Sequence, residues 1–165
     1  MSLEVVRTKI RGGEIDLRPA VADDESFLYS SWLKSYRGAS ANVGVSSSVY
    51  FARNKKRIAN ILERSDTCVV IANSINDPNH ILGYACFELR KSSIVIHFIY
   101  VKQAYRRFGI ATVLLDLIKG ALDGRQLFCS HAPADEALLS SIASNGIVYD
   151  PGTIERDDDE DTQNG

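Results

Sequence analysis

The chain of 165 residues has no long apolar run and very little net charge. Without an apolar stretch of about 20 residues it offers no segment able to span a bilayer, and its first residues show no signal-peptide pattern. The formal net charge of −2 argues against general nucleic-acid binding, which favours a clearly basic surface. We therefore expect a cytoplasmic protein that binds neither membranes nor nucleic acids.

Cysteine and histidine are also scarce, with three residues of each type. Cys68, Cys86 and Cys129 lie far apart in apolar stretches, and this odd number favours buried free thiols over a disulfide framework. The histidines and cysteines are scattered rather than spaced as metal ligands are, so we expect no bound metal.

The charges are spread unevenly along the chain. Residues 155–165 contain six acidic residues, one basic residue and no apolar residue, which predicts a disordered acidic tail over residues 154–165. The preceding residues, 1–153, are long enough for one domain. Without residues 155–165 the chain has 18 lysines and arginines against 15 acidic residues, and this mildly basic body suits an anionic ligand.

Hydrophobic periodicity predicts an α/β fold with a mixed sheet. The expected order is β-α-α-β-β-β-α-β-α-β, with the strand after the third helix parallel to the strand before it. The expected strands cover residues 14–19, 67–72, 81–89, 94–101, 126–130 and 147–149. The expected helices cover about 24–36, 48–64, 109–121 and 133–145, with a small, polar loop at 37–47.

Residues 94–121 carry the strongest functional signal in the sequence. A β-branched strand leads through a basic turn into a strongly amphipathic helix. The first N–H groups of a helix have no intrahelical partner and bind anions, and two arginines in the turn add forked donors. Gly109 and Ala111 keep bulk away from this point. We interpret residues 106–111 as a phosphate cradle.

Three segments resemble the GNAT (Gcn5-related) N-acetyltransferase family. Residues 15–28 (IDLRPAVADDESFL) are similar to its first strand and helix start, and residues 81–89 (ILGYACFEL) to its third strand. The strongest match is Arg106-Arg107-Phe108-Gly109-Ile110-Ala111, which fits the acetyl-CoA signature Gln/Arg-x-x-Gly-x-Gly/Ala. The expected order of elements is that of the GNAT fold, and the resemblance covers about residues 14–150.

The resemblance implies an N-acetyltransferase that moves acetyl from acetyl-CoA to a primary amine by direct attack in a ternary complex. Its partners are then acetyl-CoA and an amine acceptor, and a homodimer is allowed. Trp32 and Tyr36 lie on elements that wall the acceptor pocket in the family. The implied cofactor-binding residues are Ile99, Tyr100, Val101, Arg106, Arg107, Phe108, Gly109, Ile110 and Ala111.

The residues for proton transfer depart from the family's pattern. Many members carry a glutamate base on the strand that matches residues 94–101, but this strand has no carboxylate and offers His97 instead. A histidine titrates in the range that a base needs. Glu88, on the preceding strand, is a second candidate base. A structural role, as a backbone-bonded histidine or a solvated glutamate, is the alternative for each.

The family's usual general acid is also missing. It is a tyrosine four residues before the glycine that ends the last helix, and counting back from Gly146 gives Ile142. The stand-ins that we consider are Tyr149, Tyr100 and the Cys129-Ser130-His131 group, of which His131 is the catalytic candidate. A Cys129 nucleophile is a further alternative.

Two other functions remain as alternatives. One is a catalytically weak GNAT-fold protein that binds acyl-CoA, because the tyrosine is absent. The other is a nucleotide-binding module, but the turn lacks the Gly-x-Gly-x-x-Gly pattern after the first strand of a parallel sheet.

Overall fold

The computed structural model describes residues 4–37, 44, 46–131 and 136–155 of the chain. Its strands form one mixed sheet in chain order, antiparallel from β1 to β5 and parallel from β5 to β7. The strands are β1 (Val6–Ile10), β2 (Gly13–Pro19), β3 (Thr67–Ser74), β4 (Asp77–Leu89), β5 (Ser93–Val101), β6 (Gln126–Cys129) and β7 (Val148–Tyr149). The mixed α/β fold and the parallel crossover into β6 are therefore confirmed.

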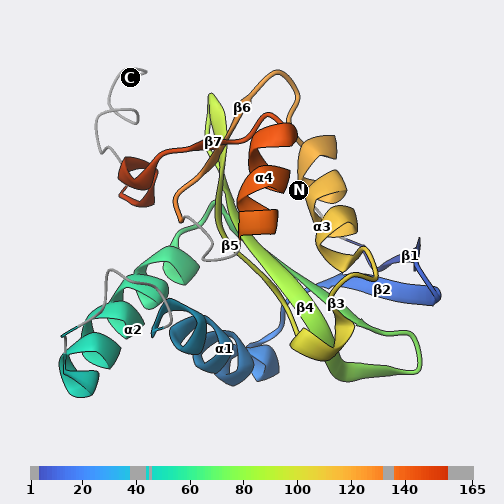
Figure 1. Cartoon of the computed structure of the whole chain (residues 1–165), viewed down its shortest axis with the longest axis horizontal. Helices are drawn as coiled ribbons and strands as arrows, with labels where there is room; N and C mark the ends of the chain where they lie inside the picture. Colours follow the sequence, from blue (N-terminus) through green and yellow to red (C-terminus); the bar gives the residue numbers. More distant parts are fainter. Residues whose placement is uncertain (1–3, 38–43, 45, 132–135, 156–165) are drawn as a thin grey trace.

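Helices cover both faces of this sheet (Figure 1). They are α1 (Glu25–Arg37), α2 (Ser47–Glu63), α3 (Ile110–Gly120) and α4 (Glu136–Ser144), with short 3-10 turns η1 (Ala22–Asp24), η3 (Gln103–Tyr105) and η4 (Pro151–Ile154). α1 and α2 pack on one face around Trp32, Tyr84 and Ile58. α3 packs on the other face, where its stripe of Ile110, Leu114 and Ile118 meets the sheet. The sheet thus separates two apolar cores.

The sequence missed one strand and misjudged one turn. β1 was not predicted because its side chains are mostly exposed, so its sequence lacks the alternation of apolar and polar residues that a half-buried strand shows. Between the predicted strands 67–72 and 81–89 the turn is only Ile75 and Asn76, since Ser74 already pairs with Asp77. The next pair is Asn73 with Ile81, so residues 78–80 bulge out of the ladder, and this places Pro78 where no ladder hydrogen bond is needed.

The buried face of α2 carries polar as well as apolar side chains. Phe51 is 39% exposed, whereas Tyr50 and Asn54 are buried with Ile58 and Ile61. The Tyr50 hydroxyl donates to the Leu33 carbonyl at 2.7 Å, which ties α2 to α1. A polar stripe at helical spacing was therefore buried because its hydrogen-bonding groups find partners inside the helix pair.

The last helix ends as predicted. Gly146 has φ +73°, and the N–H of Ile147 donates to the carbonyl of Ile142 while that of Gly146 donates to Ala143. These two bonds are those of a Schellman cap, which a glycine in the left-handed conformation allows. Ile142 itself packs against the α3-side core, so the position where the family carries a tyrosine is filled by an apolar side chain.

Other expectations concern the cysteines and the chain ends. All three cysteines are free thiols, with Cys86 and Cys129 buried and Cys68 half-buried. Among the described residues, no helix has the length and apolar composition needed to cross a membrane. The predicted acidic tail lies outside the described residues except for Ile154, the last residue of η4, and Glu155.

Candidate functional site

The phosphate cradle lies between η3 and the first turn of α3. Arg107 and Gly109 both have positive φ, +70° and +87°, so the chain folds back on itself just before the helix. Gly109 is the N-cap and supplies no side chain to the helix end. The first helical bond is donated by the N–H of Val113 to the Gly109 carbonyl. The amides of residues 109–112 precede that bond, and this arrangement favours an anion.

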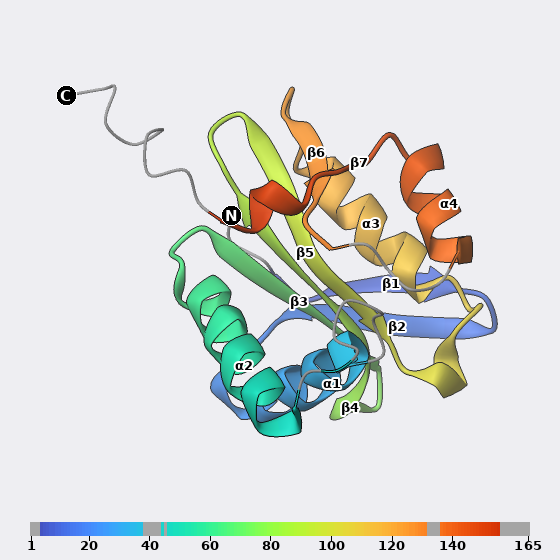
Figure 2. The same ribbon diagram turned by 60° about the vertical axis from the view of Figure 1, so that its left-hand side comes forward.

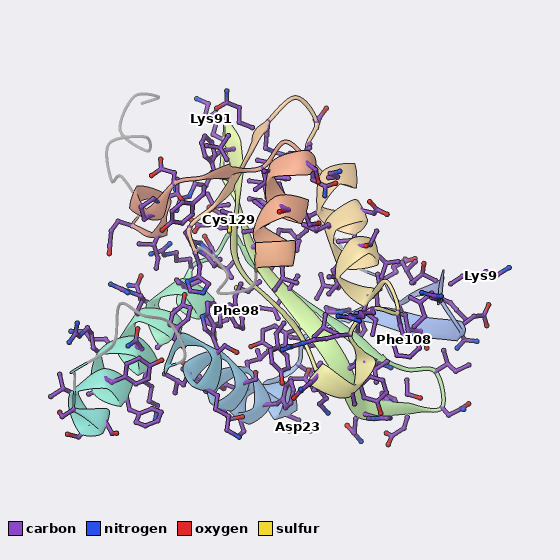
Figure 3. All side chains as sticks on the ribbon, viewed as in Figure 1. Lys9, Asp23, Lys91, Phe98, Phe108 and Cys129 are labelled. Carbon is purple, nitrogen blue, oxygen red and sulfur yellow. The ribbon has the colours of Figure 1, made fainter. Side chains whose placement is uncertain are left out.

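The β1–β2 hairpin supports the cradle from the side. The N–H of Arg11, at the hairpin tip, donates to the carbonyl of Phe108 at 2.9 Å. A Cβ on Gly12 would lie 3.9 Å from the Phe108 ring, so the tip and the cradle touch. Figure 3 shows Phe108 and Lys9 on this side of the molecule. The unpredicted β1 therefore helps to fix the cradle.

A second feature of the site is the edge of β5 beyond the last residue of β6. Pairing between these strands ends at Ile96 and Cys129, whereas β5 continues to Val101. The N–H of Lys102 donates to Leu82, and alternation along an antiparallel pair then turns the main-chain groups of Ile99 and Val101 away from β4. We call residues 99–101 the splayed edge. Figure 2 shows β6 beside the upper part of β5 only.

The three residues of the splayed edge differ in what they offer. Ile99 and Val101 point main-chain groups to the open side, where an extended ligand can form hydrogen bonds with them. The main chain of Tyr100 pairs with Tyr84 of β4, so only its side chain is left to contribute. The carbonyl of Val101 already accepts a hydrogen bond from Nε of Arg106 at 3.1 Å, which joins the edge to the cradle.

A bulge in β5 sets the orientation of the residues before this edge. Phe87 of β4 pairs with Ile96, and Cys86 pairs with Phe98, so His97 is the extra residue of a β-bulge. The bulge turns both His97 and Phe98 toward the face covered by α1 and α2. Strict alternation would have placed these neighbours on opposite faces.

Glu88 is the centre of a buried polar network on that face. Its carboxylate accepts hydrogen bonds from Arg64 at 2.9 Å and from Arg90 at 3.2 Å, and it lies 2.9 Å from Nε2 of His97. Burial by itself raises the pKa of Glu88, but the hydrogen bonds from His97, Arg90 and Arg64 outweigh it and hold the pKa far below its usual range. Glu88 is therefore an ionised, fully paired carboxylate, neither solvated nor free to act as a base.

His97 is equally enclosed. It has no exposed surface, and its Nδ1 lies 2.9 Å from Oγ of Ser130. Burial lowers the pKa of His97 and the two nearby arginines lower it further, against the opposing effect of Glu88. The ring is therefore neutral near pH 7, and its enclosure disfavours the expected role of a directly acting base.

The C-terminal segment closes the network from outside. Arg64 donates to the carbonyl of Ile154 at 3.0 Å, and Arg90 donates to the carbonyl of Thr153 at 2.7 Å. η4 thus rests on the two arginines that hold Glu88. This contact was not predictable from the sequence, because the two arginines lie about 60 to 90 residues before η4.

Trp32, Tyr36 and His131, three of the predicted site residues, meet in one aromatic group with Phe98. Trp32 stacks on Phe98 at 4.9 Å, and the Tyr36 ring lies 4.5 Å from that of His131. We call these four residues the aromatic wall. Burial lowers the pKa of His131 to about 4, so its ring is neutral at pH 7 and lacks the proton that a general acid gives up. The sequence did not point to Phe98 as a site residue, because a phenylalanine in a strand is typical of the hydrophobic core.

Of the other predicted stand-ins for the missing tyrosine, Tyr149, Tyr100 and Cys129 lie outside the network. Tyr149 is on β7 and is 49% exposed. Tyr100 packs beside Phe98 and Tyr84. The Cys129 thiol donates to the His131 carbonyl at 2.7 Å, and burial raises the pKa of this thiol. Ser130 is the exception, because its hydroxyl contacts His97.

Comparison with known proteins agrees with this architecture. The family model described as acetyltransferase (GNAT) family matches residues 27–137, and the chain belongs to this family. A search of curated proteins finds no match. The cradle and the splayed edge thus lie in an acetyltransferase domain.

Similar solved structures share the GNAT fold at low sequence identity. A putative acetyl transferase from Pyrococcus furiosus has a TM-score of 0.62 and 15% identity, over 78% of this chain and 89% of that one. The GNAT domain of S. lividans PAT has a TM-score of 0.58 and 16% identity, over 86% of each chain. The aminoglycoside N-acetyltransferase AAC(6')-Iy in complex with CoA has a TM-score of 0.50 and 15% identity, over 83% of this chain and 90% of that one.

Proposed function

We propose that this protein is an acetyl-CoA-dependent N-acetyltransferase that transfers acetyl directly to a primary amine in a ternary complex. The observation that carries the proposal is the cradle joined to the splayed edge. In this proposal the amides of residues 109–111 bind the CoA pyrophosphate, with Arg106, Arg107 and Phe108 completing the turn. The main chains of Ile99 and Val101 bind the pantetheine. The similar AAC(6')-Iy structure in complex with CoA supports the choice of ligand.

The aromatic wall is the proposed acceptor side. Trp32, Tyr36 and Phe98 are almost fully buried, and their aromatic rings make this side of the site apolar and uncharged. An amine that approaches here is favoured in its neutral form, since an ammonium ion pays a desolvation cost against apolar groups. Neutral amine is the form that attacks a thioester, and a lysine-like amine near pKa ~10.4 is mostly protonated at pH 7. A proton acceptor is therefore part of the proposal.

Calorimetric titration with acetyl-CoA tests the cofactor part. We expect saturable binding by the wild type and at least a tenfold higher Kd in Gly109→Ala, because a side chain at φ +87° displaces the cradle. Gly124→Ala is the matched control: Gly124 has φ +79° and equally open surroundings, but it lies in the turn after α3. An equal loss of affinity in both variants would show that the loss comes from general backbone strain and not from a change in the cradle.

Thiol release from acetyl-CoA tests the transferase part. The panel contains an alanyl peptide with a free N-terminus, Nα-acetyl-lysine amide, ethanolamine and free alanine, which cover the acceptor classes. Release with one of them supports the enzyme. The second candidate is a catalytically weak acyl-CoA-binding protein, favoured by Ile142 at the family's tyrosine position. Tight acetyl-CoA binding without release on any acceptor would select this second candidate.

A further inference from the structure

Ser130 carries a buried hydroxyl at a position that the proposed function leaves without a role. Its N–H donates to the carbonyl of Ile96 at 3.0 Å, at the point beyond which β5 continues without β6. Its Oγ lies 2.9 Å from Nδ1 of His97, and Nε2 of His97 lies 2.9 Å from Glu88. Side chains from β4, β5 and the end of β6 thus form one continuous line of hydrogen bonds.

The direction of each hydrogen bond in this line follows from the ionisation of Glu88, the residue at one end of the line. Glu88 is ionised and only accepts, so Nε2 of His97 must carry the hydrogen between them. A neutral imidazole with a protonated Nε2 has a lone pair on Nδ1. The Ser130 hydroxyl must therefore donate to Nδ1 of His97. This polarises the Ser130 O–H bond and makes its oxygen a better proton acceptor.

Ser130 also occupies the junction of the two proposed ligand surfaces. Its backbone bond to Ile96 places it beside the start of the splayed edge, and its chain neighbour His131 belongs to the aromatic wall. If cofactor lies along the edge and acceptor against the wall, the thioester and the amine meet at this junction. His97 is one hydrogen bond farther from it, and Glu88 two.

We propose that Ser130, His97 and Glu88 form a proton relay for acetyl transfer, in which the Ser130 hydroxyl contacts the reacting atoms. The inference rests on the acetyltransferase function proposed above and deepens it. Ser130 is the catalytic residue of the relay. His97 and Glu88 act through Ser130 and are positioning residues.

The relay serves both proton transfers of the reaction. The amine nitrogen forms a bond to the thioester carbonyl carbon, and its proton passes to Oγ of Ser130 while the Ser130 hydroxyl proton passes to Nδ1 of His97. The C–S bond then breaks, the CoA sulfur takes a proton from Ser130, and His97 returns its proton to Ser130. The products are the N-acetyl amine and the CoA thiol, and the side chains regain their starting protonation states.

The charges around His97 fit a transient imidazolium. Glu88 on β4 favours the charged ring, whereas Arg64 after α2 and Arg90 after β4 oppose it. From η4, the carbonyls of Thr153 and Ile154 face the arginines rather than the ring. The ring is thus neutral at rest, ready to accept a proton, and stabilised by Glu88 once it has one.

Steady-state kinetics with the fastest acceptor of the panel test the relay. At pH 7 we expect Ser130→Ala to lower kcat about 100-fold with the KM for acetyl-CoA unchanged, and Ser130→Thr to recover part of the rate because it keeps a hydroxyl. The matched control is Ser31→Ala, since Ser31 is also buried and bonded to a side chain, Tyr84, but lies on α1. A kcat for Ser130→Ala within twofold of the wild type overturns the relay.

The pH profile separates a relay from a merely structural network. Wild-type kcat should fall on the acid side as His97 becomes protonated. Glu88→Gln removes the charge that favours protonated His97, so the acid limb should move to lower pH while the plateau drops. An acid limb in the same place contradicts the relay. An acetyl group found on Ser130 by mass spectrometry also overturns it in favour of a covalent intermediate.

A spectroscopic readout keeps this inference distinct from the proposed function. Nitrogen NMR of the histidine-labelled protein at pH 7 should show His97 with a hydrogen on Nε2 and none on Nδ1. A hydrogen on Nδ1 contradicts the relay whether or not the protein turns over. If the wild type releases no thiol with any acceptor, the proposed function is contradicted instead. The hydrogen bonds between Ser130, His97 and Glu88 would then exist without a catalytic use.

Discussion

At the scale of single residues, the buried polar side chains explain much of the site. Glu88, His97 and Ser130 are buried without being left unpaired, and the two arginines supply the charge that keeps Glu88 ionised. Truncating one member of such a network leaves its neighbours buried without partners, which costs about 1–3 kcal/mol for each unsatisfied group. Conservative variants are therefore the informative ones.

The lowered pKa of His131 leads to a prediction of how the free energy of unfolding depends on pH. Its pKa is about 4 in the folded protein against 6.5 as the ordinary value. Between these values the unfolded state binds one more proton, so stability rises with pH and is lost as pH falls from about 6.5 toward 4, by about 1.4 kcal/mol per pH unit. Urea unfolding at several pH values measures this slope.

The control for this slope is His131→Phe, which keeps an aromatic ring against Tyr36 and removes the titration. We expect a clearly flatter pH dependence in this variant, with the remainder due to groups such as His97, whose pKa is also lowered. An unchanged slope between pH 6.5 and 4 would show that His131 titrates normally and is not enclosed by the aromatic wall.

At the scale of elements, the close approach of β4 and β5 shapes the splayed edge. A Cβ on Gly83 would lie 2.5 Å from the carbonyl oxygen of Tyr100, which is closer than these two atoms can approach without a shift of the strands. We expect Gly83→Ala to destabilise the fold by about 2–3 kcal/mol. The measurement is chemical denaturation with matched unfolding slopes.

Gly13→Ala is the control, because Gly13 also lies in a strand, β2, and a Cβ there meets nothing within 4 Å. It should change stability by less than about 1 kcal/mol. If Gly83→Ala is as mild as Gly13→Ala, the strands separate easily at this point, and the splayed edge is less rigid than the register of β4 and β5 indicates.

The sequence predicted those parts of the site that lie in one continuous segment. Strand β5, the cradle and α3 follow one another within residues 93–120, so composition and spacing alone pointed to an anion site. The conformation at Arg107 was not predictable, since a positive φ is unusual for arginine and follows from the docked hairpin and helix around it.

The polar network could not be predicted in the same way. Its members come from β4, β5, the end of α2 and the end of β6, and the bulge at His97 breaks the alternation on which face assignments depend. The resemblance to the family made His97 a candidate base, because it lies on the strand where many members carry a glutamate. The fold shows that His97 is enclosed and hydrogen-bonded to Ser130.

At the scale of the whole molecule, the two faces of the sheet contribute different parts of the proposed site. The α3 face supplies the cradle at a helix end, and the α1 and α2 face supplies the aromatic wall and the polar network (Figure 1). The two faces meet where β5 and β6 stop pairing. In the proposed function, cofactor and acceptor lie on opposite sides of one strand edge, with Ser130 between them.

A crystal structure of the protein with bound CoA tests this account most directly. We predict that pyrophosphate oxygens accept hydrogen bonds from the amides of residues 109–111, at about 2.7–3.2 Å. The pantetheine should then run along Ile99 and Val101, with its sulfur within hydrogen-bond reach of Ser130 Oγ. CoA bound with its pyrophosphate away from residues 106–111, or absent at saturating concentration, would contradict the account.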